Sequence, residues 1–342
     1  MKRIAIQIGA IVVLALARPG TADAQLLKST PPTPAAMAAL GLKEVTLTSG
    51  NRERVLLVQE PANPASPAPV VVLLHGGTQS MRRMFAPQAG ATLEWLAVAR
   101  ANNILLLAPN GTNAETGDAK GDTQFWNDFR DAATARTTTA GDVAFIREML
   151  GWAHKTYKTD PARTYVTGAS NGGMMTYRLL IETPETFAVG AAFIAALPAE
   201  IARVPKPARP TPLLIMSGTA DPLVQWNGGP ILGNRGSVSS AAESLKWWIA
   251  ANRAQLEPIG IEQLPHLDPK DTCSIERKTF AAQANGAPVV FYTNQGGGHA
   301  MPSMKHAIPD GWLVRRFIGH VCRDVEAADL TWDFFKQYTR SQ

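Results

Sequence analysis

The chain has 342 residues, of which 45% are hydrophobic and 18% are charged, and its formal net charge is +5. This length and apolar content are sufficient for one α/β domain with a sizeable core, but short for two independent domains. The positive charge is small, and no basic run carries interleaved aromatic residues, so we expect no nucleic-acid partner.

The first 24 residues have the three-part pattern of a secretory signal peptide. Lys2 and Arg3 precede an apolar stretch over residues 4–17, and the small residues 22–24 mark a cleavage site before Gln25. The alternative is a membrane anchor, but the stretch is shorter than the roughly 20 residues that span a bilayer, and a Pro-Gly pair ends it. We therefore expect an exported protein, periplasmic or secreted, without a stable membrane anchor.

Beyond the cleavage site, residues 25–41 are rich in Pro, Ala and Thr and predict an extended leader. Short apolar runs, typical of strands buried on both faces, cover residues 45–47, 55–58, 70–74, 104–108, 164–167, 188–195, 212–217 and 289–293. Segments with helical spacing cover residues 93–102, 141–157, 171–181, 241–251 and 332–338. This alternation predicts that residues 42–342 form a single α/β domain, with a mostly parallel central sheet and helices on both faces.

The most informative motif is Gly168-Ala-Ser-Asn-Gly172, which lies between a predicted strand and a predicted helix. In that position Gly-x-Ser-x-Gly is typical of a nucleophile elbow, a tight turn that presents the serine hydroxyl at the top of a sheet. Ser170 is therefore the candidate nucleophile. Its chemistry depends on an acid, a base and oxyanion donors elsewhere in the chain.

The candidate acid is Asp221, which follows the predicted strand 212–217. The carboxyl ends of parallel strands share one edge of a sheet, so Asp221 would lie on the same side as the elbow. A turn-capping role before a proline is the alternative. Asp142 and Asp160 precede the serine and are typical of helix or turn caps.

The candidate base is His299, which follows the last predicted strand in the segment 296–299. Three glycines directly before it would allow the loop to fold back over Ser170. The resulting order Ser, Asp, His is that of α/β hydrolases. In this hypothesis His299 takes the serine proton, and Asp221 fixes the imidazole tautomer. Four other histidines lack such a setting: His154, His266, His306 and His320.

Two backbone N–H groups are candidates for an oxyanion hole. One belongs to Asn171, the residue after the serine. The other belongs to Gly77 in the His-Gly-Gly-Thr segment that follows the predicted strand 70–74, with Thr78 as the alternative. An ordinary strand-ending turn would explain His-Gly-Gly alone, but the serine motif favours the oxyanion role.

The chain has two cysteines, Cys273 and Cys322. Because an exported protein meets an oxidising compartment, we expect them to form a disulfide. The bridge would close a loop of about 50 residues and contribute about 4 kcal/mol of stability on the chain-entropy model. Two separate buried thiols are the alternative.

Taken together, these motifs resemble the exported polyhydroxybutyrate depolymerase and feruloyl esterase group of α/β hydrolases. The resemblance runs from about residue 45 to Phe335, and residues 329–335 are similar to the family's closing helix. It rests on four motifs in order: His75-Gly-Gly-Thr-Gln79, Gly168-Ala-Ser-Asn-Gly-Gly-Met-Met175, Gly218-Thr-Ala-Asp-Pro-Leu-Val224 with Asn227-Gly-Gly229, and Gly296-Gly-Gly-His299 with Pro302. The resemblance implies the α/β-hydrolase fold and a Ser170, Asp221 and His299 triad. The motifs are far less specific for the substrate than for the fold and the triad.

One departure from this family concerns the loop after His299, which reads Ala-Met301-Pro where the family often has Thr-Trp-Pro. A methionine there predicts a softer pocket of different shape. Trp126 and Trp226, on loops above the predicted sheet, are the other candidates for binding substrate, with core packing as the equal alternative. No Thr-rich linker or binding module follows the catalytic domain, so we expect small esters or oligomers rather than crystalline polymer.

The sequence therefore predicts a serine carboxylic-ester hydrolase that acts on hydroxyalkanoate oligomers or on aromatic and plant cell-wall esters. A serine peptidase on the same fold and a non-catalytic binding protein on a hydrolase scaffold are the alternatives. No metal motif, phosphate loop or dinucleotide fingerprint occurs, so we expect neither a metal nor a cofactor. The expected partner is the small or oligomeric ester, and the sequence does not indicate an oligomeric state.

Overall fold

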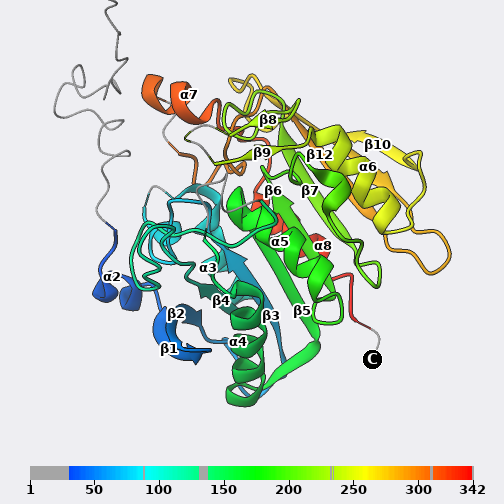
Figure 1. Cartoon of the computed structure of the whole chain (residues 1–342). Coiled ribbons are helices and arrows are strands. Elements are labelled where there is room, and N and C mark those ends of the chain that lie inside the picture. The colour runs from blue at the N-terminus through cyan, green and yellow to red at the C-terminus, as the bar shows by residue number, and fades with distance from the viewer. Residues whose placement is uncertain are drawn as a thin grey trace, which may run out of the picture.

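The structure is a computed structural model that describes residues 31–87, 89–130, 138–231, 233, 235–308 and 311–340. The expected signal peptide, residues 1–24, lies outside these ranges. A ten-stranded sheet crosses the molecule in the order β1-β2-β4-β3-β5-β6-β7-β12-β11-β10 (Figure 1). In the same order the strands are Lys43–Ser49, Arg52–Gln59, Leu105–Pro109, Ala68–Leu74, Thr159–Ala169, Val189–Phe193, Leu213–Gly218, Val289–Gln295, Ser274–Phe280 and Gly260–Gln263.

The centre of the sheet is parallel and both edges are antiparallel. The strands from β4 to β12 in this order run parallel to one another. At one edge β1 and β2 are antiparallel, and at the other edge β11 and β10 are antiparallel. A two-stranded ribbon of β8 (Gly229–Pro230) and β9 (Ser237–Val238) lies apart from the sheet.

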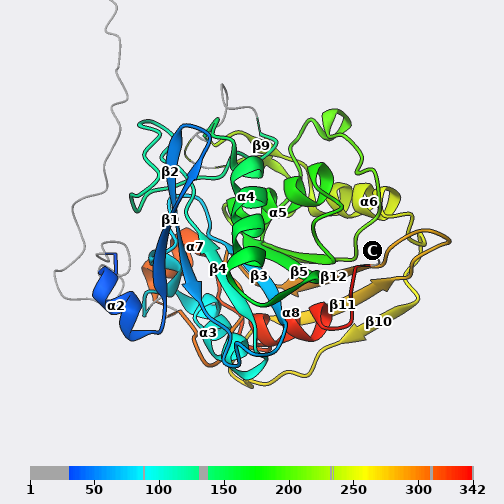
Figure 2. The ribbon, with the colours of Figure 1, turned by 90° about the horizontal axis from the view of Figure 1, so that it is seen from below.

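Helices cover both faces of the sheet, as predicted (Figure 2). Helices α4 (Asp142–Thr156), α5 (Asn171–Glu182) and α6 (Ala241–Ala251) lie on one face, and α3 (Glu94–Ala101) and α8 (Ala327–Phe335) lie on the other. Alternate side chains of β3 enter two separate hydrophobic clusters, one under each helical layer. Its continuous apolar sequence is therefore the consequence of burial on both faces.

The structure corrects the prediction that residues 25–41 are extended throughout. Residues Pro34–Ala39 form a short helix, α2, which begins after Thr33. The Thr33 side chain accepts a hydrogen bond from a backbone N–H of the first turn, and a proline occupies that turn, so local capping favours the helix. Met37 is buried against the same cluster as α3 and α8, which attaches this segment to the domain.

Besides α2, the sequence did not predict the ribbon strands β8 and β9, the strands β11 and β10 at one side of the sheet, or helix α7. Strand β10 is exposed along its whole length, and β11 is mostly half-buried, so neither has a continuous apolar run. Helix α7 (Trp312–Ile318) is short and has two arginines in its last turn. Within the described ranges, every helix is too short or too polar to cross a bilayer.

Candidate active site

Ser170 occupies a sharp turn between β5 and α5. Its backbone has φ 56° and ψ −124°, a conformation that is unusual for a residue other than glycine and typical of a nucleophile elbow. The flanking glycines permit the turn. A Cβ on Gly172 would lie 2.4 Å from the carbonyl oxygen of Leu74, and one on Gly168 would lie 2.5 Å from the Gly172 carbonyl carbon. The two glycines therefore allow α5 to pack directly against β3 and β5.

Asp221 and His299 form a close hydrogen-bonded pair. Asp221 follows β7, and its Oδ2 lies 2.7 Å from Nδ1 of His299. Its Oδ1 accepts hydrogen bonds from the backbone N–H groups of Leu223 and Val224, at 2.8 and 2.9 Å. Because the carboxylate is buried, these contacts fix its position, and an N–H at Nδ1 of His299 leaves Nε2 as an acceptor.

The other acids and histidines considered from the sequence have different partners. Asp142 forms a buried ion pair with Arg54, and Asp160 pairs with Arg163. Three histidines are also paired with carboxylates away from Asp221: His266 with Asp324, His306 with Glu94, and His320 with Asp271. His154 contacts the hydroxyls of Thr159 and Thr164.

Ser170 and His299 line the same pocket, together with Gly77 and Asn171. This pocket lies where the carboxyl ends of β3, β5, β7 and β12 meet, at the edge of the sheet that faces β8, β9 and α7 in Figure 1. Its apolar wall consists of Phe125, Met174, Leu223, Val224 and Ile231. Three segments distant in sequence therefore contribute predicted site residues to one cavity.

Backbone hydrogen bonds distinguish between Gly77 and Thr78, the two alternative oxyanion donors in the loop after β3. The N–H of Thr78 donates to the carbonyl of Gln124 at 2.9 Å, so it is not available to a substrate. Within the described part of the chain, the N–H of Gly77 has no acceptor. Asn171 is the first residue of α5, where backbone N–H groups lack intrahelical acceptors. Gly77 and Asn171 therefore both offer donors at the pocket.

His75 is buried behind these donors. Its Nε2 accepts a hydrogen bond from the N–H of Gly111 at 3.0 Å, and its Nδ1 lies 2.8 Å from the Gly76 carbonyl. Burial lowers the pKa of this imidazole to about 4, so it is neutral at pH 7, with its proton on Nδ1. His75 therefore connects the loop before Gly77 to the loop after β4.

The side chain of Asn171 connects the elbow to the loop after β4. Its Oδ1 accepts a hydrogen bond from the N–H of Trp126 at 2.7 Å, and its Nδ2 donates to the Trp126 carbonyl at 3.1 Å and to Asp128 at 2.7 Å. Asp128 also accepts hydrogen bonds from Arg130. This network was not predicted, because an Asp and an Arg two residues apart are common on solvated loops.

Known proteins with similar sequences identify the family. The Esterase family model, described as "Putative esterase", matches residues 48–253, more than half of the chain. The chain belongs to this esterase family. The esterase is 29% identical over 317 residues to "Putative esterase NocK" of Nocardia uniformis subsp. tsuyamanensis, a match that covers 88% of this chain and 84% of that protein. It is 27% identical over 256 residues to poly(3-hydroxyalkanoate) depolymerase C of Paucimonas lemoignei, covering 71% of this chain and 56% of the depolymerase.

Further relatives are named feruloyl esterase B, from Piromyces equi, and acetylxylan esterase A, from Aspergillus oryzae, of which the esterase spans 32% and 47%. The solved acetyl xylan esterase from Aspergillus awamori shares the fold, with a TM-score of 0.54 at 16% identity, over 81% of this chain and 98% of that one. The fold is therefore that of α/β hydrolases, and the family and its named members make this chain a carboxylic-ester hydrolase.

The three residues expected to bind substrate do not line the pocket of the esterase. Trp126 is fully buried, its indole N–H donates to the His75 carbonyl at 2.9 Å, and its ring packs on the His75 imidazole at 4.8 Å. Trp226 is half-buried against Phe291. Met301 is buried in the hydrophobic cluster on the face of the sheet that α3 and α8 cover. Core packing explains all three positions. Phe125, the neighbour of Trp126, provides the aromatic wall instead.

The loop that carries the histidine is held from behind by backbone contacts. The N–H of Gly298 donates to the carbonyl of His320 at 2.7 Å, and the N–H of His299 donates to the carbonyl of Ile318 at 2.5 Å. A Cβ on Gly298 would lie 2.1 Å from the same Ile318 oxygen, so only glycine permits this approach. The position of His299 therefore depends on the segment 318–320.

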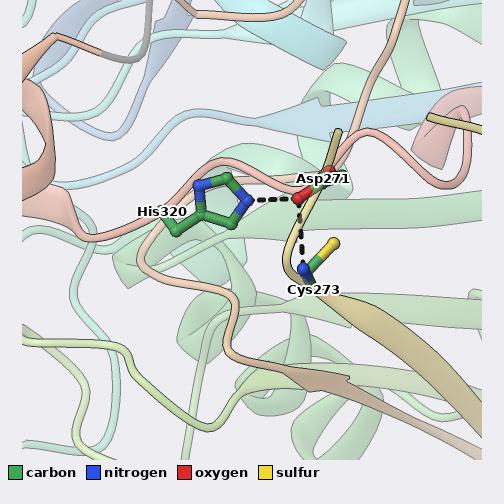
Figure 3. A group of neighbouring side chains, drawn as sticks. All are labelled: Asp271, Cys273 and His320. Carbon is green, nitrogen blue, oxygen red and sulfur yellow. Dashed lines mark hydrogen bonds and ion pairs between the residues drawn. The ribbon is translucent and has the colours of Figure 1, made fainter. Parts of the chain in front are cut away.

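A buried cluster of hydrogen bonds and a disulfide, here called the brace, fixes the segment 318–320. Figure 3 shows three of its side chains, Asp271, Cys273 and His320. Asp271 accepts hydrogen bonds from Nε2 of His320 and from the backbone N–H groups of Cys273 and Arg323. Burial raises the pKa of Asp271, but these hydrogen bonds outweigh it and hold the pKa below its usual range. Cys273 and Cys322 are joined by a disulfide, with their Cα atoms 5.7 Å apart. Since the cysteine sulfurs bond to each other, the cluster is a structural brace rather than a thiolate metal site.

Proposed function

We propose that the esterase acts through a Ser170, Asp221 and His299 triad, with the N–H groups of Gly77 and Asn171 as the oxyanion hole. The observation that carries this proposal is the buried Asp221–His299 hydrogen bond of 2.7 Å, in a pocket that also contains Ser170 at a strained turn. A serine at a strained turn that shares its pocket with an oriented imidazole supports nucleophilic acyl transfer.

The reaction follows from these groups. Nε2 of His299 takes the proton of Ser170 as its hydroxyl oxygen attacks the ester carbonyl carbon. Asp221 stabilises the imidazolium that forms, and the two backbone N–H groups donate to the developing oxyanion. His299 then protonates the departing alcohol oxygen, which leaves an acyl-enzyme. A water molecule, deprotonated by the same imidazole, hydrolyses the acyl-enzyme and regenerates the serine.

The substrates that we propose are hydroxyalkanoate oligomers or aromatic and plant cell-wall esters. Support comes from the names of the relatives, which include a depolymerase, a feruloyl esterase and acetylxylan esterases. The apolar pocket wall of Phe125, Met174 and Ile231 suits the acyl part of such esters.

We also propose that the protein is exported. The charged and apolar pattern of residues 1–24 supports this, as does a disulfide, which persists in oxidising compartments. Mass spectrometry of the protein recovered from periplasm and medium tests it, with Gln25 as the expected first residue. Recovery of full-length protein from the cytoplasm alone would reject export.

Steady-state hydrolysis of p-nitrophenyl butyrate tests the triad. We expect Ser170→Ala to lower kcat by about 10⁴-fold or more, and Asp221→Asn by a comparable factor, with the circular dichroism spectrum unchanged. Ser66→Ala, on an exposed loop before β3, is the matched control and should keep wild-type activity. Turnover retained by Ser170→Ala would reject the proposal, and cleavage of peptide bonds at a comparable rate would favour a peptidase instead.

A further inference from the structure

Two arginines line the pocket that contains Ser170, and the hydrolysis of a neutral ester uses neither of them. They are Arg130, which precedes residues outside the described ranges, and Arg235, which follows β8. The described residues that line this pocket include no acidic side chain. The charged side chains among these described pocket residues are therefore both guanidinium groups, and Asp128 balances the charge of Arg130 from behind the wall.

The side chain of Arg130 is only 4% exposed, and its hydrogen bonds hold it in one orientation. Its Nε lies 3.0 Å from both carboxylate oxygens of Asp128, and its Nη2 lies 2.7 Å from one of them. Its Nη1 donates to the backbone carbonyl of Arg235 at 2.6 Å. Asp128 is fixed from its other side by Nδ2 of Asn171. A guanidinium with a fixed plane loses little conformational entropy when it binds a further group.

The guanidinium of Arg130 retains donor capacity beyond this network. Each Nη carries two hydrogens, and among the described residues each Nη has one bonding partner residue: Asp128 for Nη2 and Arg235 for Nη1. One N–H on each Nη therefore has no protein acceptor in the described part of the chain. Paired N–H groups of an arginine match the two oxygens of a carboxylate.

We propose that Arg130 and Arg235 recognise a carboxylate on the substrate, close to the ester bond that is cleaved. This inference rests on the proposed function and selects between its two substrate classes. A linear hydroxyalkanoate oligomer ends in a free carboxylate, which in the dimer belongs to the alcohol that leaves. Feruloyl esters of sugars and acetylated sugars carry no such charge. The guanidinium donors at the pocket therefore favour the oligomer, and the arginines determine specificity.

A matched pair of substrates tests the proposal on the wild-type protein. One is the linear dimer of 3-hydroxybutyrate, and the other is the same dimer with its carboxyl group converted to a primary amide. The cleaved ester and the released acyl product are identical, so chromatography of 3-hydroxybutyrate measures both reactions, once it is counted that each cleavage releases two molecules from the acid and one from the amide. We expect kcat/KM to be at least about tenfold higher for the acid, since hydrogen bonds to charged groups contribute more than neutral ones.

Two variants assign the preference to the arginines. Asp128→Asn combined with Arg130→Gln removes both charges of the buried pair and leaves no uncompensated ion. Arg235→Gln removes the second positive charge without touching the buried pair. In each variant the ratio of kcat/KM for acid over amide should fall toward one, whereas a purely structural role would lower both values in proportion. Arg203→Gln, an exposed arginine paired with Glu200, is the control and should keep the wild-type ratio.

The outcomes separate this inference from the proposed function. A wild-type ratio near one, a ratio unchanged in both variants, or cleavage of p-nitrophenyl butyrate but of neither dimer would overturn the carboxylate proposal and leave the triad standing. Failure of the wild-type protein to hydrolyse p-nitrophenyl butyrate would instead reject the proposed function itself.

Discussion

Acidification should destabilise the esterase through His75, a histidine outside the proposed triad. Its Nε2 accepts a hydrogen bond from the N–H of Gly111, and its ring is 1% exposed. Protonation would remove that acceptor and place a charge in the core. Burial therefore lowers the pKa of His75 to about 4 in the folded protein, against about 6.5 in the unfolded chain.

The sign and size of the effect follow from these two pKa values. Because the folded-state pKa of His75 is the lower one, the unfolded chain binds more protons between pH 6.5 and pH 4. The free energy of unfolding therefore falls as the pH falls. With a folded-state pKa of about 4, the loss is about 2 kcal/mol between pH 7 and pH 5 and about 3 kcal/mol by pH 4.

Urea unfolding of the wild type and of His75→Asn at pH 7, 6 and 5 measures this loss. Asparagine keeps an N–H that can donate to the Gly76 carbonyl but does not titrate, and all other ionisable groups are shared. The stability difference between wild type and variant should shrink by about 2 kcal/mol from pH 7 to pH 5. Stability curves that stay parallel over this range would refute the reasoning.

Two further predictions concern the brace and the elbow. Replacing Cys273 and Cys322 with alanine opens a loop with a sequence separation of 49, and should lower the free energy of unfolding by about 4 kcal/mol and reduce kcat on p-nitrophenyl butyrate. Unchanged urea midpoint and kcat would contradict this. Gly172→Ala should unfold or inactivate the esterase, because its Cβ would lie 2.4 Å from a β3 carbonyl oxygen, whereas Gly151→Ala, in open space on α4, should stabilise by about 1 kcal/mol. Similar melting temperatures for the two variants would be inconsistent with this account.

The sequence was sufficient to predict the central sheet and the residues that meet at its edge. Buried parallel strands have continuous apolar runs, and a motif directly after each run places its residues at the same edge. Ser170, Asp221 and His299 were found in this way. Strands β10 and β11 were missed because an exposed or half-buried strand leaves no continuous apolar signal, and only the pairing of β11 with β12 and of β10 with β11 defines them.

The pocket could not be predicted to the same extent. Phe125 and Trp126 are adjacent in an extended segment, so their side chains point to opposite sides, and only one can face the substrate. The sequence does not show which one, because the choice depends on Asn171 and His75, which bond the Trp126 backbone and indole. Arg130 was missed for a related reason, since its burial depends on tertiary contacts.

Covalent labelling of Ser170 tests the central claim most directly. A fluorophosphonate reacts with activated serine nucleophiles, so mass spectrometry of the digested wild-type protein should find one adduct, on Ser170. The adduct should be absent from Ser170→Ala and strongly reduced in His299→Asn, which lacks the proposed base. An adduct on a different residue, or a Ser170→Ala protein that still labels and still hydrolyses p-nitrophenyl butyrate, would contradict the account.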